Sequence, residues 1–222
     1  FDYTTDVIDN AKTLITKQKP AEAIKLLNES EILLPRTNEP NYQYMYTSLY
    51  AAKSSAFALL GNLQETQKSL AQMRKYQEQF GEKDWFSFYI SQINSCAVYF
   101  ATRDDYKPAF HLIHFAKEKV NEKGLLEDAA TTKHERNIKT MFDAKMKADS
   151  LEVLFNKEKN THKWATVGLE LTDILLRRMK YDAALNISIM VYEKVKAMPD
   201  LAEKYVEALQ YVKTCAMSCK KY

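Results

Sequence analysis

The sequence predicts an all-α protein, and three observations carry this prediction. The 222 residues include only 4 Gly and 5 Pro, which leaves little turn chemistry for a sheet of many strands. Residues with high helix propensity are abundant. Small and large apolar residues recur at a fixed interval, which is typical of a repeated helical unit. With 46% hydrophobic residues, the chain can also bury a substantial core.

The repeat is clearest at a small residue that follows each expected turn. Ala23, Thr66 and Ala109 are spaced by 43 residues, and Ala184 follows after 75. Twelve residues before each of these positions stands another small residue, followed three residues later by a large apolar one. These pairs are Ala11 and Leu14, Ser54 and Phe57, Ala97 and Phe100, and Thr172 and Leu175. Small residues let two helices approach closely, so each unit is expected to be helix, short turn, helix.

Local turn signals agree with this register. Pro20 and Pro108 suit the first turn of a second helix, where no intrahelical donor is needed. Gly61 can adopt the left-handed conformation that ends a first helix. Tyr106 and Tyr181 are expected to pack over their turns.

The pattern divides the chain into successive segments, which we take as one domain, 1–222. Helical pairs are expected at about 4–37, 41–81, 84–124 and 161–198, with an irregular helical segment at 125–160 and a terminal helix at 199–219. In the irregular segment, one long helix is expected to replace a hairpin, because its apolar residues keep helical spacing without a turn signal: Met141, Ala144, Ala148, Leu151 and Phe155. The terminal helix is expected to close the stack or to connect to a further region.

This arrangement resembles the tetratricopeptide repeat (TPR) family. The matching residues are Ala11, Leu14, Ala23, Leu27, Pro35, Ser54, Phe57, Gly61, Leu70, Ala97, Phe100, Tyr106, Ala109, Ala116, Leu171, Leu175, Tyr181 and Ala184. The resemblance implies a right-handed superhelix of antiparallel helical hairpins, an α-α solenoid, with one irregular long helix and a C-terminal capping helix. The unit is longer than the usual 34 residues or so, which predicts longer helices or connections. Gly168 replaces the larger Val7, Tyr50 and Ile93, which predicts looser packing in the last unit.

The resemblance also implies a binding groove lined by the first helix of each hairpin. Its offsets correspond to Ile8, Lys12, Ile15, Ala51, Ser55, Ala58, Asn94, Val98, Ala101, Leu169, Asp173 and Leu176. Tyr44 is added because it lies off the helical stripe of its tyrosine-rich neighbours. The predicted peptide-binding residues are therefore Lys12, Tyr44, Ser55, Asn94, Val98 and Asp173. An equally weighted alternative is that the chain's own long helix covers these positions.

Other side chains give weak signals for chemistry. Trp85, Phe86 and Phe88 are expected to plug the core instead of forming a binding platform. His111, His114 and Glu118 could share a metal ion, but the remaining ligands of a metal site are not evident. Cys215 and Cys219, four residues apart, and the third cysteine, Cys96, do not make a disulfide framework. The sequence therefore predicts no catalytic residue, metal or cofactor.

Charge and hydropathy limit the classes of partner. The formal net charge is +3, with 32 basic and 29 acidic residues, which does not favour nucleic acid. The longest apolar run is too short to span a membrane. The first residue is Phe1 instead of Met, so a processed or trimmed chain is expected. The compartment is not predicted.

Three functions remain open at this point. The first is a non-catalytic scaffold that binds a protein or peptide in its groove, or a second copy of itself. The second is the sensory input region of a larger bacterial regulator, such as a histidine kinase or a transcriptional regulator. The third is a metal-dependent helical enzyme using His111, His114 and Glu118, which ranks far below the others.

Overall fold

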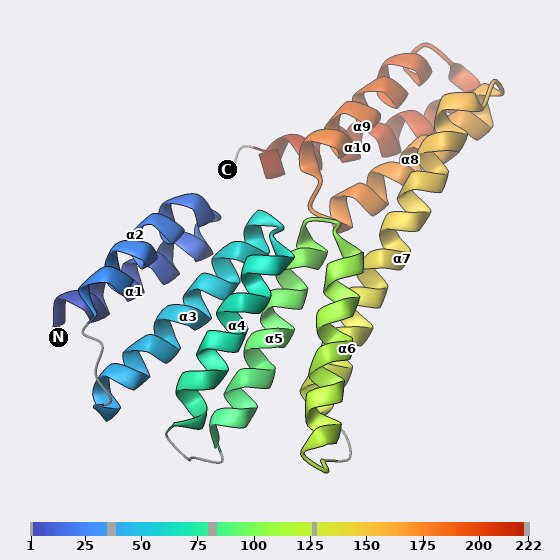
Figure 1. Ribbon diagram of the computed structural model, residues 1–222. Helices are drawn as coiled ribbons and strands as arrows, with labels where there is room; N and C mark the ends of the chain where they lie inside the picture. The colour runs from blue at the N-terminus through green and yellow to red at the C-terminus, as the bar shows by residue number, and fades with distance from the viewer. Residues whose placement is uncertain (1, 35–38, 80–83, 126–127, 220–222) are drawn as a thin grey trace. The chain divides into compact units, whose positions relative to one another are not determined.

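The computed structural model describes residues 2–34, 39–79, 84–125 and 128–219 (Figure 1). Every regular element in these ranges is helical, which confirms the all-α class. The elements are α1 (Asp2–Thr16), α2 (Pro20–Leu33), α3 (Pro40–Leu60), α4 (Leu63–Glu78), α5 (Asp84–Thr102), α6 (Tyr106–Glu122), α7 (Ala129–Lys157), α8 (Thr161–Arg177), α9 (Tyr181–Val195), the short 3₁₀ helix η1 (Pro199–Leu201) and α10 (Ala202–Cys219). Pro35 and the unit ends expected at 37 and 81 lie outside the described residues.

The chain separates into two compact units. Unit 1 is Phe1–Lys139 and unit 2 is Thr140–Tyr222, so the boundary falls inside α7. That these units act as a single repeat domain stays a prediction.

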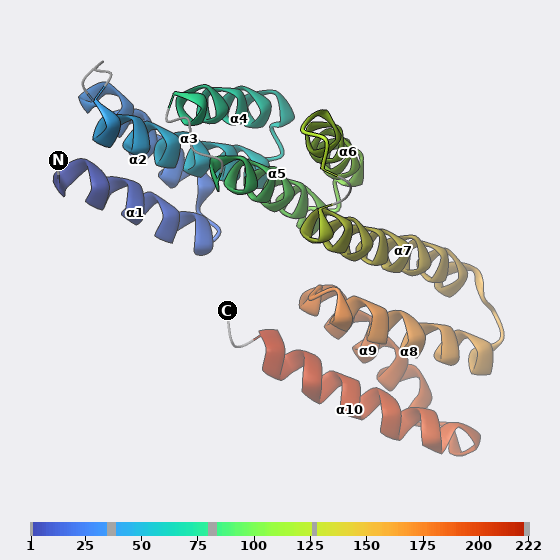
Figure 2. The same cartoon turned by 90° about the horizontal axis from the view of Figure 1, so that it is seen from below.

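Within unit 1, consecutive helices pair in chain order. α1 packs on α2, α3 on α4, and α5 on α6. α3 also contacts α1 and α2, and α5 contacts α3 and α4 in the same way. Figure 2 shows α4 and α6 on the same side of α5, whereas α2 and α3 overlap in this view. In unit 2, α8 packs on α9, and α10 contacts both, which repeats the order of contacts.

The small residues of the sequence repeat occupy the helix contacts. Ala11, Ser54, Ala97 and Thr172 are completely buried, and so are Ala23, Thr66, Ala109 and Ala184. These positions fall on first and second helices alike, where a small side chain lets the two backbones approach. The prediction that these residues face neighbouring helices is confirmed.

Four turns share one backbone geometry. The residue seven positions after each small residue of the first helix has a positive φ: Gln18 (59°), Gly61 (79°), Asp104 (63°) and Met179 (59°). At the first turn, the Gln18 amide donates to the Ile15 carbonyl at 3.0 Å and the Lys19 amide to the Leu14 carbonyl at 2.9 Å. The other three turns repeat both bonds. This Schellman-type ending satisfies the last carbonyls of each first helix.

The expected roles of two turn residues are also confirmed. Gly61 takes the left-handed conformation. Tyr106 is 7% exposed, and its hydroxyl donates to Asp104 Oδ1 at 3.1 Å, within the third turn. Tyr181 is only half-buried.

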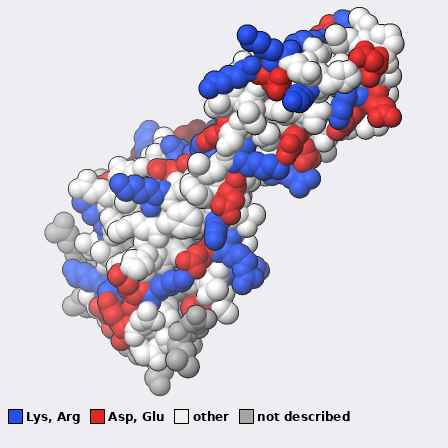
Figure 3. Space-filling model, turned by 90° about the vertical axis from the view of Figure 1, so that its right-hand side faces the viewer, with Lys and Arg blue, Asp and Glu red and all other residues white. Residues whose placement is uncertain are grey.

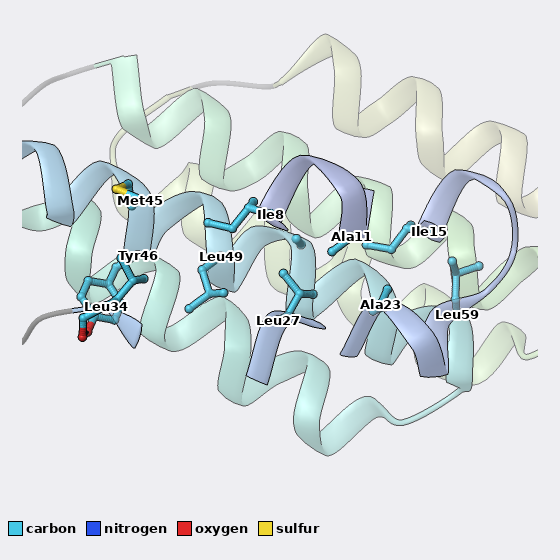
Figure 4. Packing of buried hydrophobic residues seen from close by; sticks show 12 residues of the cluster. Ile8, Ala11, Ile15, Ala23, Leu27, Leu34, Met45, Tyr46, Leu49 and Leu59 are labelled. Atoms are coloured by element: carbon cyan, nitrogen blue, oxygen red, sulfur yellow. The ribbon is translucent and has the colours of Figure 1, made fainter. Parts of the chain in front are cut away.

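One core cluster of unit 1 lies where α1, α2 and α3 meet (Figure 4). Ile8 and Ile15 extend from α1 toward Leu27 of α2 and Leu49 of α3, and all four are at most 5% exposed. Burial of each such side chain contributes about 1.5–3 kcal/mol. Ile8 and Ile15, which the resemblance assigns to the groove, are therefore core residues.

The long helix predicted for the irregular segment is confirmed as α7, which has 29 residues. In unit 2 its apolar face of Ala148, Leu151 and Phe155 is buried. The Phe155 ring stacks on Trp164 of α8 with a centroid distance of 4.6 Å. This contact joins the end of α7 to the beginning of α8.

The packing expected around Gly168 is wrong. A Cβ atom built at Gly168 would lie 2.5 Å from Val191 Cγ2 and 2.6 Å from Phe155 Cε2. Both neighbouring side chains are at most 3% exposed, so they have little freedom to move. Gly168 marks a close approach of α8 to its neighbours, not a loose one.

Charges of both signs are mixed on the surface. On the face drawn in Figure 3, Lys and Arg side chains lie among Asp and Glu side chains. Many exposed ion pairs join residues three or four apart on one helix, as Lys12 Nζ does with Asp9 Oδ1 at 2.9 Å. Over the described part of the chain, we find no helix with the length and hydropathy that a membrane span requires.

Candidate functional site

The predicted groove residues at the two ends of the repeat are engaged in local ion pairs. Lys12 is exposed on α1 and pairs with Asp9, one turn earlier. Asp173 is half-buried on α8, and its Oδ2 pairs with Arg177 Nη2 at 2.8 Å. These two residues belong to different units, so they are described separately.

Ser55 takes part in a polar bridge between α3 and α5. It is 9% exposed. Gln92 Nε2 of α5 donates to Ser55 Oγ at 2.8 Å, to Ser54 Oγ at 3.0 Å and to the Ala51 carbonyl at 2.9 Å. One amide group therefore satisfies several buried acceptors of α3, and Ser55 takes part in the packing of α3 against α5.

Asn94 is covered by the beginning of α7. It is completely buried, and its Nδ2 donates to Thr131 Oγ1 at 2.9 Å. The Thr131 hydroxyl and amide donate in turn to Asp128 Oδ2 at 2.5 and 2.8 Å, which caps the first turn of α7. The sequence left open the alternative that the long helix covers the predicted groove residues, and for Asn94 the structure shows this cover.

Most of the other residues that the resemblance assigns to the groove are also buried. Ala51, Ala58, Ala101 and Leu169 are at most 7% exposed. Val98 is half-buried on α5, whereas Tyr44 is 56% exposed on α3. Of the six residues predicted to bind a peptide, these two and the ion-paired Lys12 and Asp173 keep solvent contact. Within unit 1, the burial of Ser55 and Asn94 interrupts the predicted groove.

The structure instead brings Tyr44 together with two residues that the sequence assigns to the core. The Tyr44 and Trp85 ring centroids are 6.0 Å apart with an angle of 60° between the rings. Trp85 and Phe88 are 6.1 Å apart at 73°. Phe88 is 43% exposed, so its expected role as a core plug is wrong. We call Tyr44, Trp85 and Phe88 the aromatic surface.

The helices position the aromatic surface near their N-terminal ends. α3 begins at Pro40, whose fixed φ suits the first helical position, and Tyr44 follows one turn later. α5 begins at Asp84, immediately before Trp85, and Phe88 lies three residues after Trp85, on a neighbouring part of the helix surface. Two consecutive first helices of the repeat thus contribute to one cluster.

Uncharged residues continue from Phe88 along the same face of α5. Ser91 and Thr102 are exposed, and Ser95 and Val98 are half-buried. Ser95 Oγ donates to the Ser91 carbonyl at 2.9 Å, within the helix. This α5 line, made of Ser91, Ser95, Val98 and Thr102, gives hydroxyl groups and one apolar contact beside the aromatic surface.

The two histidines of α6 each contact a nearby polar side chain. His111 Nε2 lies 3.0 Å from Gln67 Nε2 of α4. His114 Nε2 lies 3.2 Å from Glu118 Oε1, and both side chains are more than half exposed. Among the described residues, no three His, Cys, Asp or Glu side chains are arranged to hold a metal ion.

The surroundings of the two cysteines of α10 favour the protonated thiol. Burial raises the pKa of Cys215 above its ordinary value. Desolvation and the neighbouring Asp182 carboxylate raise the pKa of Cys219, whose Sγ donates to Asp182 Oδ1 at 3.4 Å. A raised pKa keeps a thiol protonated at neutral pH, whereas nucleophilic and metal-binding cysteines are thiolates.

Of the three residues of the aromatic surface, only Tyr44 could be recognised from the sequence, because it lies off the helical stripe of the neighbouring tyrosines. The exposure of Phe88 depends on how α5 lies beside α3, which is a long-range property.

Comparison with known proteins adds no relative: no protein-family model, no curated protein and no solved structure matches this chain.

Proposed function

We propose that this chain is a non-catalytic protein-binding module of the TPR-like type, in which stacked helical hairpins present a surface to a peptide segment of a partner. The repeated turns, the buried small residues and the repeated order of helix contacts support this proposal. The aromatic surface and the α5 line are the proposed binding residues. Ser55 and Asn94 are assigned to the scaffold.

The exposure of Tyr44 and Phe88 carries the proposal. Exposure of a large aromatic side chain to water is unfavourable, and such side chains dominate the energetics of interfaces when they are buried there. Here two aromatic rings from consecutive first helices stay 56% and 43% exposed around Trp85. Uncharged neighbours on α5 favour an extended or helical peptide over a highly charged tail.

A random peptide library displayed on phage tests this function. Peptides selected on the immobilised chain are synthesised, and their dissociation constants are measured by calorimetry. The Tyr44→Ser/Phe88→Ser variant should bind them at least about tenfold more weakly, since it loses two aromatic contacts. Circular dichroism checks that the variant is folded.

The matched control is Leu60→Ser/Leu125→Ser, which removes two other exposed apolar side chains of unit 1, 43% and 53% exposed. It should keep the affinity of the parent chain. A selection that yields no peptide, or equal binding by the aromatic double variant, contradicts the proposed function.

A further inference from the structure

A neighbouring pair of rings on α5 already holds an arginine. Phe86 and Tyr89 are three residues apart, and Arg74 of α4 places its guanidinium carbon 5.6 Å from the Phe86 ring centroid and 5.5 Å from the Tyr89 ring centroid. Lys123 Nζ lies 5.7 Å from the Phe86 centroid. A cation at this distance is attracted by the negative face of the ring. The start of α5 is thus a structure that binds cations within the molecule.

The aromatic surface repeats this pair one residue earlier. Trp85 and Phe88 have the same spacing of three residues on the same helix, and Tyr44 adds a third ring. Neighbouring ring centroids lie 6.0 and 6.1 Å apart, and the rings are inclined by 60° and 73°. Rings at this separation and inclination can each lie within about 6 Å of one cation. Tyr44 and Phe88 are exposed, so the cation would come from solvent.

We infer that Tyr44, Trp85 and Phe88 bind an arginine side chain of the partner segment. This inference rests on the proposed function and adds the chemistry of the residue that the surface recognises. Arginine is favoured over lysine because a planar guanidinium is weakly hydrated and can stack on aromatic faces. Arg74 shows that a guanidinium already lies over the Phe86 ring on this helix. The partner is therefore a segment with an arginine whose neighbours can contact the uncharged α5 line.

The test compares N-acetyl-arginine amide with N-acetyl-citrulline amide, which has the same shape without the charge. Both are titrated to millimolar concentration into the whole chain carrying Trp164→Phe, so that fluorescence reports Trp85 alone. The arginine amide should give a saturable change, and the citrulline amide should bind at least about fivefold more weakly. Equal binding of the two compounds overturns the inference.

Substitutions locate the site. Tyr44→Leu and Phe88→Leu keep an apolar side chain but remove the ring, and each should weaken arginine amide binding about fivefold. Phe115→Leu is the control, since that ring already faces Lys119 Nζ at 5.4 Å on α6; it should change nothing. Binding that survives both substitutions overturns the assignment to these rings.

The two proposals fail separately. If selected peptides bind through Tyr44 and Phe88 but tolerate replacement of every arginine by citrulline, the arginine inference is overturned and the proposed function stands. If arginine amide binds and no peptide is selected, the cation site stands and the peptide-binding function is overturned. If neither ligand depends on the rings, both are overturned.

Discussion

At the scale of single residues, Gly168 decides how closely α8 approaches its neighbours. Its position next to Val191 and Phe155 leaves no space for a methyl group. A helical glycine normally lowers helix stability by about 1 kcal/mol relative to alanine. The close contact and the helix propensity act in opposite directions, and the sign of the stability change in Gly168→Ala shows which effect is larger.

We expect Gly168→Ala to destabilise the protein by roughly 1–3 kcal/mol, because the added methyl group displaces buried side chains. Urea unfolding followed by Trp164 fluorescence in a Trp85→Phe background measures the change. Thr166→Ala, at an exposed position two residues earlier on α8, should have a small effect. A gain in stability from Gly168→Ala would mean that helix propensity decides and that the contact is readily relaxed.

At the scale of elements, α2 is held to α3 by a charged cluster. Glu31 of α2 accepts hydrogen bonds from the Tyr50 hydroxyl and from Lys53 Nζ, both on α3. The Lys53 side chain is only 8% exposed. Tyr46, Tyr50 and Tyr76 stack beside this cluster, and the Tyr46 and Tyr76 centroids lie 4.6 Å apart. A nearly buried ammonium group depends on its carboxylate partner.

This cluster predicts a pH dependence. Burial alone would raise the pKa of Glu31, but the hydrogen bonds from Lys53 and Tyr50 and the charge of Lys53 lower it below its ordinary value of 4.5. A carboxyl group with a lowered pKa stabilises the fold above its unfolded pKa, and this stabilisation is lost as the pH falls through the folded pKa. Glu31→Gln should therefore be less stable than the parent chain at pH 7, and the difference should shrink below pH 4.5.

Urea unfolding of both chains between pH 3 and 7 measures this difference. Glu29→Gln removes an exposed carboxyl group from the same helix and is the control. A constant difference between Glu31→Gln and the parent chain at every pH would contradict the assignment of the ion pair.

The elements also show what a sequence can and cannot reveal. The helices, the turn positions and the buried small residues follow from local spacing, so Ala97 and Ala109 could be placed correctly. The burial of two predicted groove residues could not be foreseen, because Asn94 contacts Thr131, 37 residues later, and Ser55 contacts Gln92 of another helix. The aromatic surface was missed for the same reason, since Tyr44 and Phe88 meet only after α3 and α5 have packed.

At the scale of the whole molecule, the two compact units each contain one tryptophan. Trp85 lies in unit 1 and Trp164 in unit 2. Leu27 and Leu171, both at most 2% exposed, are core residues of unit 1 and unit 2 respectively. These four residues allow the stability of each unit to be followed separately.

We expect each unit to respond to its own core. Leu27→Ala should cost about 2–5 kcal/mol and lower the unfolding midpoint reported by Trp85 in a Trp164→Phe background. Leu171→Ala should do the same for Trp164 in a Trp85→Phe background. Each substitution is also measured in the other background. If Leu27→Ala or Leu171→Ala lowers the midpoints reported by Trp85 and by Trp164 equally, the two units unfold as one.

The shared turn geometry has a consequence for how such a chain can vary in length. Gln, Gly, Asp and Met all occupy the same left-handed site, although three of them are disfavoured there. The packing of the flanking helices therefore determines the left-handed conformation of the turn, and the residue at this position only has to adopt it. A helical hairpin could accordingly be duplicated or deleted as a whole, and its turn would not need a new glycine at the left-handed position.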